Sequence, residues 1–250
     1  MKAMYRLVVM MVAAVALLTL SMPVYASKDS RIESSAKKSH VFMTYLKADD
    51  ITIQSKDGAV TLTGTVSEES HKSLAQETVA GLPGVKSVDN RLEVKGTSPA
   101  MNTDAWITAK VKTMLLFHRS VSAMTEVNTT NGIVTLQGKA TSQAQKDLTT
   151  EYAKDVEGVK DVKNEMTIAK TSKKTQTVSR KVDDASITAL VKMTLLYHRS
   201  TSALNTSVTT KNGVVTLSGK ASNAAEKDLA TKFAKDVNGV KSVKNQMTIG

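Results

Sequence analysis

The sequence contains no cysteine, and aromatic residues make up only 4% of its 250 positions. The absence of cysteine excludes disulfides, thiol nucleophiles, cysteine-ligated metal sites and a lipid-modified cysteine. With Trp106 as the only tryptophan, a large aromatic-lined ligand pocket is not expected. Acidic residues are also in the minority, and 34 basic against 23 acidic side chains give a formal net charge of +11. This excess favours anionic partners such as nucleic acid or anionic lipid, or it serves solubility alone.

Long hydrophobic runs are absent apart from residues 7–20, LVVMMVAAVALLTL. This run is shorter than the roughly 20 residues of a spanning helix. Basic residues precede it, and the small residues Val24 and Ala26 follow it, which is the pattern of a secretory signal peptide. We therefore expect residues 1–26 to be a signal peptide cleaved after Ala26, with an uncleaved anchor as the alternative. An exported chain rarely meets nucleic acid, so the positive charge is better matched to anionic lipid or another envelope polyanion.

One pattern recurs three times in the rest of the chain. Residues 131–168 and 212–249 match at 26 of 38 positions without a gap, and residues 57–94 follow the same framework more distantly. The match extends upstream, where DAWITAKVKTMLLFHRSVSA in the second copy pairs with DASITALVKMTLLYHRSTSA in the third. We predict three units at residues 28–95, 103–169 and 183–250, with a flexible basic linker over residues 170–182.

Each unit has the pattern of a helix, a hairpin, a second helix and a last strand. Ile107, Val111 and Leu115 recur every four residues, which predicts the first helix. In the first copy, residues 31–46 take its place with weaker similarity. Asp-Gly or Asn-Gly then supplies the positive φ values of a tight turn between two strands. The predicted fold class is α+β: three tandem small αββαβ units, each a three-stranded sheet with two helices on one face.

Three glycines and one asparagine recur in every copy. The first glycine completes the hairpin turn, the second marks a bulge or a close helix approach at the end of the second strand, and the third caps the second helix. The asparagine lies in the last strand, where it is expected to bond the backbone, with a ligand contact as the minor alternative. The positions are Gly58, Gly132 and Gly213, then Gly64, Gly138 and Gly219, then Gly84, Gly158 and Gly239, and finally Asn90, Asn164 and Asn245.

With these elements in place, the repeat resembles the BON domain family. The residues that carry the resemblance are the DG/NG-x-V-T-L-x-G hairpin, the G-V-K-x-V-x-N stretch and the apolar pair of the last strand. The resemblance implies an αββαβ fold, export to the periplasm and interaction with phospholipid membranes, and relatives are also associated with chaperone or osmotic-stress roles. This chain carries three units where the best-known relative carries two, which leaves open whether all three bind the same partner.

The most suggestive short match is His-Arg-Ser at residues 118–120 and 198–200. A histidine next to a serine suggests a hydrolase, but no G-x-S-x-G turn and no paired acid accompany it, and the first copy lacks the motif. One explanation is a polar helix exit, where cations favour the C-terminal dipole. The functional alternative is a head-group or other anion contact by Arg119 and Arg199.

Apolar residues directly precede this motif in both copies. They are expected to be core or to cover a neighbouring unit, or else to form a membrane-touching edge flanked by arginine. The candidate lipid-binding residues are therefore Leu116, Phe117, Arg119, Leu196, Tyr197 and Arg199. The four histidines never approach metal-ligand spacing, and Asp183-Asp184 is explained by a helix cap. We expect no catalytic residues, no metal and no cofactor.

These patterns lead to one prediction and two alternatives. We predict an exported periplasmic protein that associates with phospholipid membranes in envelope maintenance or osmotic stress, with avidity from several units. The alternative is a periplasmic chaperone for unfolded envelope or outer-membrane proteins. An enzyme is the weakest hypothesis, because no nucleophile–base pair or metal cluster recurs in the sequence.

Overall fold

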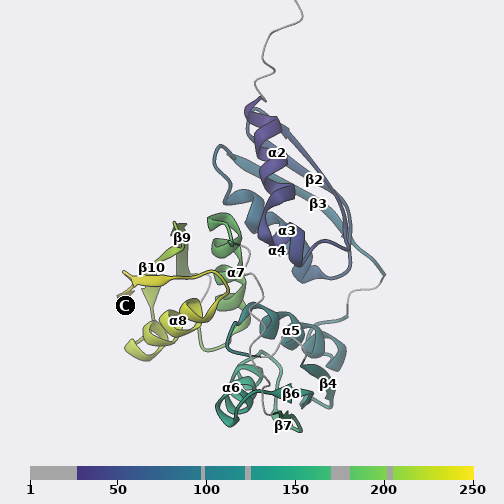
Figure 1. Cartoon of the computed structure of the whole chain (residues 1–250), viewed down its shortest axis with the longest axis vertical. Coiled ribbons are helices and arrows are strands. Elements are labelled where there is room, and N and C mark those ends of the chain that lie inside the picture. The colour runs from purple at the N-terminus through teal and green to yellow at the C-terminus, as the bar shows by residue number, and fades with distance from the viewer. Residues whose placement is uncertain (1–26, 97–98, 122–124, 170–180, 202–204) are drawn as a thin grey trace, which may run out of the picture.

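The computed structural model describes residues 27–96, 99–121, 125–169, 181–201 and 205–250. The predicted signal peptide and most of the predicted linker lie outside the described residues. Three units follow one another in the described part, and they pack against each other through their helices (Figure 1). We name them unit 1 (residues 27–96), unit 2 (residues 99–169) and unit 3 (residues 181–250).

Unit 1 has the simplest sheet, with β2 as the middle strand. β1 pairs with it antiparallel and β3 pairs with it parallel. The first helix, expected as one element, is instead two, because Ser39 is extended and its hydroxyl accepts the amide of Phe42 as a new N-cap. The elements are α2 (Lys28–Lys38), α3 (His40–Thr44), β1 (Asp50–Lys56), β2 (Ala59–Val66), α4 (Glu69–Ala80) and β3 (Ser87–Val94).

Units 2 and 3 repeat this arrangement with one long first helix each, and their last strand is interrupted once; in unit 2 the middle strand is also interrupted, between β5 and β6. In unit 3, β10 pairs antiparallel with β9 and parallel with β11 and β12. The α+β class and the small three-stranded sheets are therefore confirmed. Unit 2 comprises α5 (Asp104–Phe117), β4 (Glu126–Thr130), β5 (Ile133–Gln137), β6 (Lys139–Ala140), α6 (Gln143–Lys154), β7 (Asp161–Asn164) and β8 (Thr167–Ile168). Unit 3 comprises α7 (Asp184–Tyr197), β9 (Thr206–Lys211), β10 (Val214–Ala221), α8 (Ala224–Asp236), β11 (Ser242–Asn245) and β12 (Thr248–Ile249).

Each hairpin turn is clamped by an aspartate from the first helix of its unit. In unit 3, the Asp184 carboxylate accepts the amides of Asn212 and Gly213 at 2.7 and 2.8 Å. Asn212 and Gly213 have φ values of 53° and 79°, so the predicted turn with two positive φ angles is confirmed. Asp29 and Asp104 make the same pair of bonds in units 1 and 2. A side-chain hydrogen bond from Ser55, together with the bonds from the turn amides, lowers the pKa of Asp29.

Two glycine predictions are corrected by the structure. Gly64 has a φ of +115°, and a Cβ there would lie 2.0 Å from the carbonyl oxygen of Asp50. The close approach is therefore made by the paired strand and not by a helix. The third glycine is not a helix cap either, because α6 ends at Lys154 and a further turn separates it from Gly158. Gly158 packs against Ile107: a Cβ added to this glycine would lie 3.1 Å from the Ile107 side chain.

The recurrent asparagine bonds the backbone in all three units, as expected. The side-chain amide of Asn164 donates to the carbonyl oxygen of Lys146 in α6 at 2.8 Å, and its oxygen accepts the amide of Met166 at 3.0 Å. Asn90 and Asn245 make the corresponding bonds. The asparagine thereby ties the last strand to the second helix.

Helix α7 of unit 3 lies at the centre of the molecule, in contact with α4, α5 and α8 (Figure 1). Eleven of its 14 residues are buried, as expected for a helix covered on all sides. At its start, Asp183 caps the helix by accepting the amide of Ser186 at 2.9 Å, which confirms its expected role. Asp183 and Ser186 also accept the amides of His40 and Val41 from unit 1, at 2.7 and 3.0 Å. Within the described residues, the structure has no helix long and apolar enough to cross a membrane.

Candidate functional site

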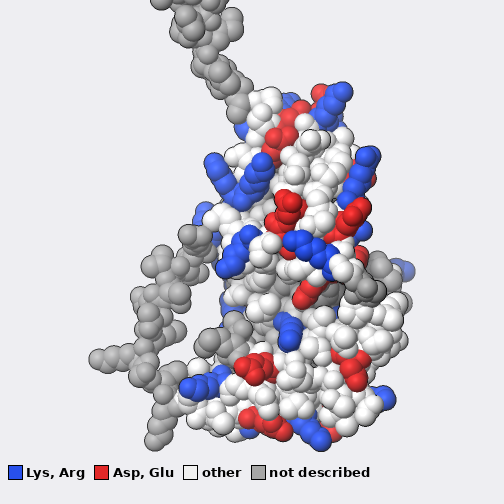
Figure 2. All heavy atoms as spheres, turned by 90° about the vertical axis from the view of Figure 1, so that its right-hand side faces the viewer, with Lys and Arg blue, Asp and Glu red and all other residues white. Residues whose placement is uncertain are grey.

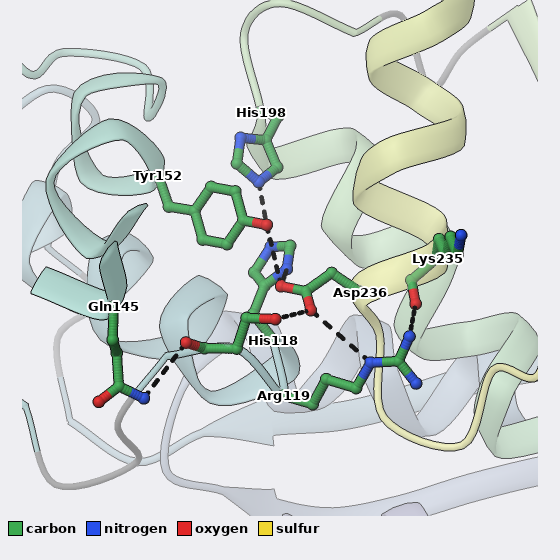
Figure 3. A network of polar contacts seen from close by, with 8 residues as sticks. His118, Arg119, Gln145, Tyr152, His198, Lys235 and Asp236 are labelled. Carbon is green, nitrogen blue, oxygen red and sulfur yellow. Dashed lines mark hydrogen bonds and ion pairs between the residues drawn. The ribbon is translucent and has the colours of Figure 1, made fainter. Parts of the chain in front are cut away.

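The two His-Arg-Ser motifs meet at the interface between units 2 and 3 (Figure 3). Beyond α5, the chain crosses to the end of α8, where the Arg119 amide donates to the carbonyl oxygen of Asp236 at 3.0 Å. Beyond α7, the chain crosses to the end of α6, where the Arg199 amide donates to the carbonyl oxygen of Asp155 at 2.8 Å. We name the set of residues 118–120, residues 198–200, Tyr152, Asp155 and Asp236 the histidine junction.

The side chains of the histidine junction form a row of four groups. Nδ1 of His118 lies 3.1 Å from Oδ2 of Asp236, and Nδ1 of His198 lies 2.9 Å from Oδ2 of Asp155. The two Nε2 atoms face each other at 3.1 Å, and both imidazole side chains are fully buried. The row therefore runs from carboxylate to imidazole to imidazole to carboxylate, and each unit supplies one acid and one histidine.

The same contacts occur twice with the units exchanged, so the interface has an approximate two-fold symmetry. The symmetry is broken at Tyr152, whose hydroxyl donates to Oδ2 of Asp236 at 2.9 Å (Figure 3). Phe233 has the equivalent place in unit 3 and has no hydroxyl to offer Asp155. Its ring instead stacks on His198, with centroids 3.7 Å apart and an interplanar angle of 10°.

Asp236 is the more heavily bonded of the two acids. Burial by itself would raise its pKa, but hydrogen bonds from His118, Ser120 and Tyr152 outweigh burial, and the net pKa of Asp236 is lowered. Burial, with the charge of Asp236, also raises the pKa of Tyr152. The carboxylate is thus ionised at neutral pH, and the phenol keeps the proton that it donates.

Each arginine lies beside Oδ1 of the aspartate whose Oδ2 faces a histidine. Nε of Arg119 lies 3.7 Å from Oδ1 of Asp236, and its guanidinium donates to the carbonyl oxygens of Lys235 and, at 3.2 Å, Val240. A cation at a helix C-terminus was expected here, but the helix is α8 of the other unit and not α5. Both arginine side chains remain about half exposed, so their outer faces are still open to an anion.

Two of the six candidate lipid-binding residues are not on the surface. Phe117 and Tyr197 are 1% and 7% exposed, because neighbouring units cover them. The ring of Phe117, for example, packs edge-on against Tyr45 of unit 1, with centroids 5.6 Å apart. The membrane-edge alternative is corrected for these two residues, which cover a neighbouring unit instead. Leu116 and Leu196 are on the surface, 41% and 49% exposed.

A second feature, a cavity of about 660 Å³, lies where the three units meet. Its walls come from the start of α4, from α5 and from the end of α7. Nζ of Lys110 lies 4.0 Å from the ring centroid of Trp106 and 5.2 Å from that of Tyr197. Burial lowers the pKa of Lys110, against an opposing effect of Glu157. The exposed surface of the cavity is thus mainly apolar, and its lining also carries the partly buried Lys110 and the acids Glu68 and Glu69.

The histidine junction is not evident from short sequence motifs, because its residues are far apart along the chain. The paired acid that seemed to be missing is supplied by the other unit, and the two histidines meet although 80 positions separate them. One signal was present: the Ala-Lys-Asp-Val that holds Asp155 and Asp236 occurs in the two copies that have His-Arg-Ser and is absent from the first. The geometry is not that of a hydrolase, because each serine bonds a carboxylate and not an imidazole.

The fold and its repeats define the class of the protein: the chain belongs to the BON domain family. Three BON domains match residues 28–96, 103–170 and 183–250, which confirms the resemblance drawn from the repeat.

Individual relatives match over about half of the chain. Osmotically-inducible protein Y of Escherichia coli (strain K12) is 35% identical over 143 residues, which cover 55% of this chain and 71% of the relative. The 21 kDa hemolysin of Actinobacillus pleuropneumoniae is 33% identical over 140 residues, 54% of this chain and 64% of the relative. Among solved structures, CdsD of the type III secretion system of Chlamydia trachomatis is 17% identical, covers 88% of this chain and 90% of that one, and has a TM-score of 0.25. At that score it adds nothing to the fold described above.

Proposed function

We propose that this protein is exported to the periplasm and associates with anionic phospholipid membranes under osmotic stress. Family membership and the name of the Escherichia coli relative support the stress-related part of the proposal. The composition of residues 1–26 supports export, and the net charge of +11 supports an anionic surface as the partner.

The observation that carries the proposal is the rim of the three-unit cavity. Met101 and Leu196 line it with large exposed surfaces, and Lys95 and Lys110 line it together with the acids Glu68 and Glu69. Apolar side chains next to lysine are the combination that inserts at the boundary between head groups and acyl chains. Charge of both signs is interleaved over the face drawn in Figure 2, so a broad basic face is not what supports binding there. We therefore expect a local contact at the cavity rim.

Vesicle flotation tests the apolar part of this contact. The full chain should float with vesicles containing phosphatidylglycerol at low salt, and much less with phosphatidylcholine alone. Leu196→Ser should weaken binding about tenfold or more, because removing a leucine from an apolar contact costs about 1.5–3 kcal/mol. Leu116→Ser is the matched control, because Leu116 is the repeat counterpart, is similarly exposed and does not line the cavity.

Two lysines of α5 test the charge. Lys110→Glu should weaken binding to the anionic vesicles, whereas Lys112→Glu changes the net charge equally from an exposed position outside the cavity lining. Equal losses would show that only net charge matters and would remove the cavity rim from the proposal. If the full chain fails to float at low salt, the membrane proposal is wrong. Suppression of client aggregation without lipid would then support the chaperone alternative.

A further inference from the structure

We propose that His118 and His198 share one proton between their Nε2 atoms, and that this proton makes the docking of unit 2 on unit 3 depend on pH. The proposal rests on the geometry of the histidine junction and is independent of membrane binding. It goes beyond the family assignment, because unit 1 has neither the motif nor the acid.

The proton follows from what each ring nitrogen faces. Each Nδ1 lies at hydrogen-bond distance from a carboxylate oxygen, so each Nδ1 carries a hydrogen. A neutral imidazole has only one N–H, so two neutral rings would present bare lone pairs to each other at 3.1 Å. One additional proton turns this repulsion into an N–H···N hydrogen bond. The row then holds three ring protons and one positive charge.

The surroundings suit a single ring cation. Asp236 and Asp155 lie 3.1 and 2.9 Å from the ring nitrogens, nearer than the 3.7 and 3.8 Å that separate them from the arginine Nε atoms, so their negative charge can balance a ring cation. The rings of Tyr152 and Phe233 cover the imidazoles, with centroids 4.0 and 3.7 Å away, and an aromatic face attracts a cation. Other charged groups line the groove between α6 and α8 at the edge of the junction: Glu151, Lys154 and Lys232.

Acid should weaken the docking. A second Nε2 proton would set two N–H groups and two cations against each other at 3.1 Å. Burial and the neighbouring His198 already lower the pKa of His118, with Asp236 opposing them. Undocked imidazoles titrate near pH 6.5. Below about this pH the docked pair therefore binds fewer protons than the undocked pair, and the docking constant falls as pH falls, by up to about tenfold per pH unit.

Base should weaken the docking too. Above about pH 6.5 the undocked rings lose their protons. We expect the docked pair to keep the shared one despite burial, because its loss would leave two nitrogen lone pairs facing each other at 3.1 Å. The docked state then binds more protons, so its stability falls as pH rises. The docking constant should thus pass through a maximum near pH 6.5. A structural junction without a shared proton has no reason to show this maximum.

A bridging metal ion is the competing explanation for two facing Nε2 atoms. Metal sites in proteins use three or four protein ligands or complete their shell with water. Among the described residues, no group of three or more histidines, cysteines or acids is placed to hold a metal. Both rings are also buried, which leaves no open side for water.

Nuclear magnetic resonance of the full chain tests the proton directly. In the 15N-labelled protein we expect a one-bond N–H signal from one Nε2 and a through-hydrogen-bond nitrogen–nitrogen coupling between the two. Hydrogen exchange of the Arg119 and Arg199 amides reports docking, because both donate across the interface. After correction for intrinsic exchange, their protection should peak near pH 6.5 and fall on both sides.

Variants separate this proton from general acid and base effects. His198→Gln keeps a hydrogen-bonding side chain but cannot titrate, so the maximum in protection should disappear. His71→Gln is the control, because His71 is also paired with an aspartate, Asp49 at 2.6 Å, but belongs to unit 1; it should leave the maximum in place.

Three results would overturn the proposal. The first is a wild-type spectrum in which neither Nε2 is protonated, and the second is a wild-type protection profile that is flat with pH. The third is protection that a chelator removes and Zn²⁺ restores, which would assign the pair to a metal. All three are read from the wild-type chain, so they stand even if His198→Gln does not fold.

Discussion

Tyr152 makes a contact in the histidine junction that the repeat cannot duplicate. Its hydroxyl donates to Oδ2 of Asp236 at 2.9 Å, while the counterpart Phe233 has no hydroxyl. Tyr152→Phe therefore removes one donor and leaves the ring that packs on His118. Because unit 3 already carries phenylalanine at the equivalent place, the ring alone is compatible with the fold.

The cost of this change can be estimated from the partners that remain. Hydrogen bonds to charged groups contribute about 1.5–3 kcal/mol. Asp236 keeps its bonds from His118 and Ser120, so we expect the lower end, about 1.5 kcal/mol, or roughly a tenfold change in the docking constant. The contribution requires an ionised Asp236. Since the pKa of Asp236 is lowered in the folded protein, the stabilisation is complete above the ordinary aspartate value of about 3.9 and is lost as pH falls through the lowered pKa.

Urea denaturation followed by the fluorescence of Trp106 measures the effect in unit 2, because no other tryptophan is present. Tyr152→Phe should lower the unfolding free energy by about 1.5 kcal/mol in the wild-type background. In an Asp236→Asn background the same change should cost much less, because its charged acceptor is gone. Equal costs in the two backgrounds, or no cost in the wild type, would refute the reasoning.

Two further predictions concern backbone geometry. Gly64→Ala should destabilise unit 1 by more than about 3 kcal/mol, because φ is +115° and the new Cβ would lie 2.0 Å from a strand carbonyl oxygen. Gly96→Ala is the control: φ is +76° but nothing lies within 4 Å of the new Cβ, so it should cost only about 1–2 kcal/mol. Equal losses of stability, measured by circular dichroism, would show that the contact is irrelevant. Asp184→Ala removes both acceptors of the hairpin amides and should destabilise unit 3 by about 2–3 kcal/mol. The local readout is hydrogen exchange of the Asn212 and Gly213 amides, which should become faster. An unchanged exchange rate would contradict the clamp.

Local structure was predictable wherever a residue type has a local physical cause. Asn212 and Gly213 indicate a turn because they tolerate positive φ, and Asp183 indicates a helix start because its carboxylate can accept an amide. Helix ends were not predictable in the same way. Val156 continues the apolar spacing of α6, yet it lies in the turn after Lys154, where it is fully buried and pairs with His198 of unit 3. A valine can be buried in a turn as well as on a helix face, so the spacing does not fix the helix end.

Packing between units could be predicted only in part. α5 and α7 are close copies, but Leu190 of α7 stands where α5 has Lys110, and this difference favours α7 as the helix that is covered on all sides. The same exchange leaves Lys110 as a cation at the cavity. The meeting of His118 and His198 has no such local cause, because it depends on how two separately folded units turn toward each other.

The close match between the second and third copies has a physical reason in the histidine junction. A two-fold contact uses the same patch from both partners, so the histidine, the arginine, the serine and the acid are each required twice. The first copy has Gly81 where the others have the acid, and there a Cβ would lie 3.3 Å from the Cα of Ala185 in α7. A carboxylate at this position would crowd the helix on which unit 1 rests. One repeat position therefore serves as an interface acid in units 2 and 3 and as a close-packing residue in unit 1.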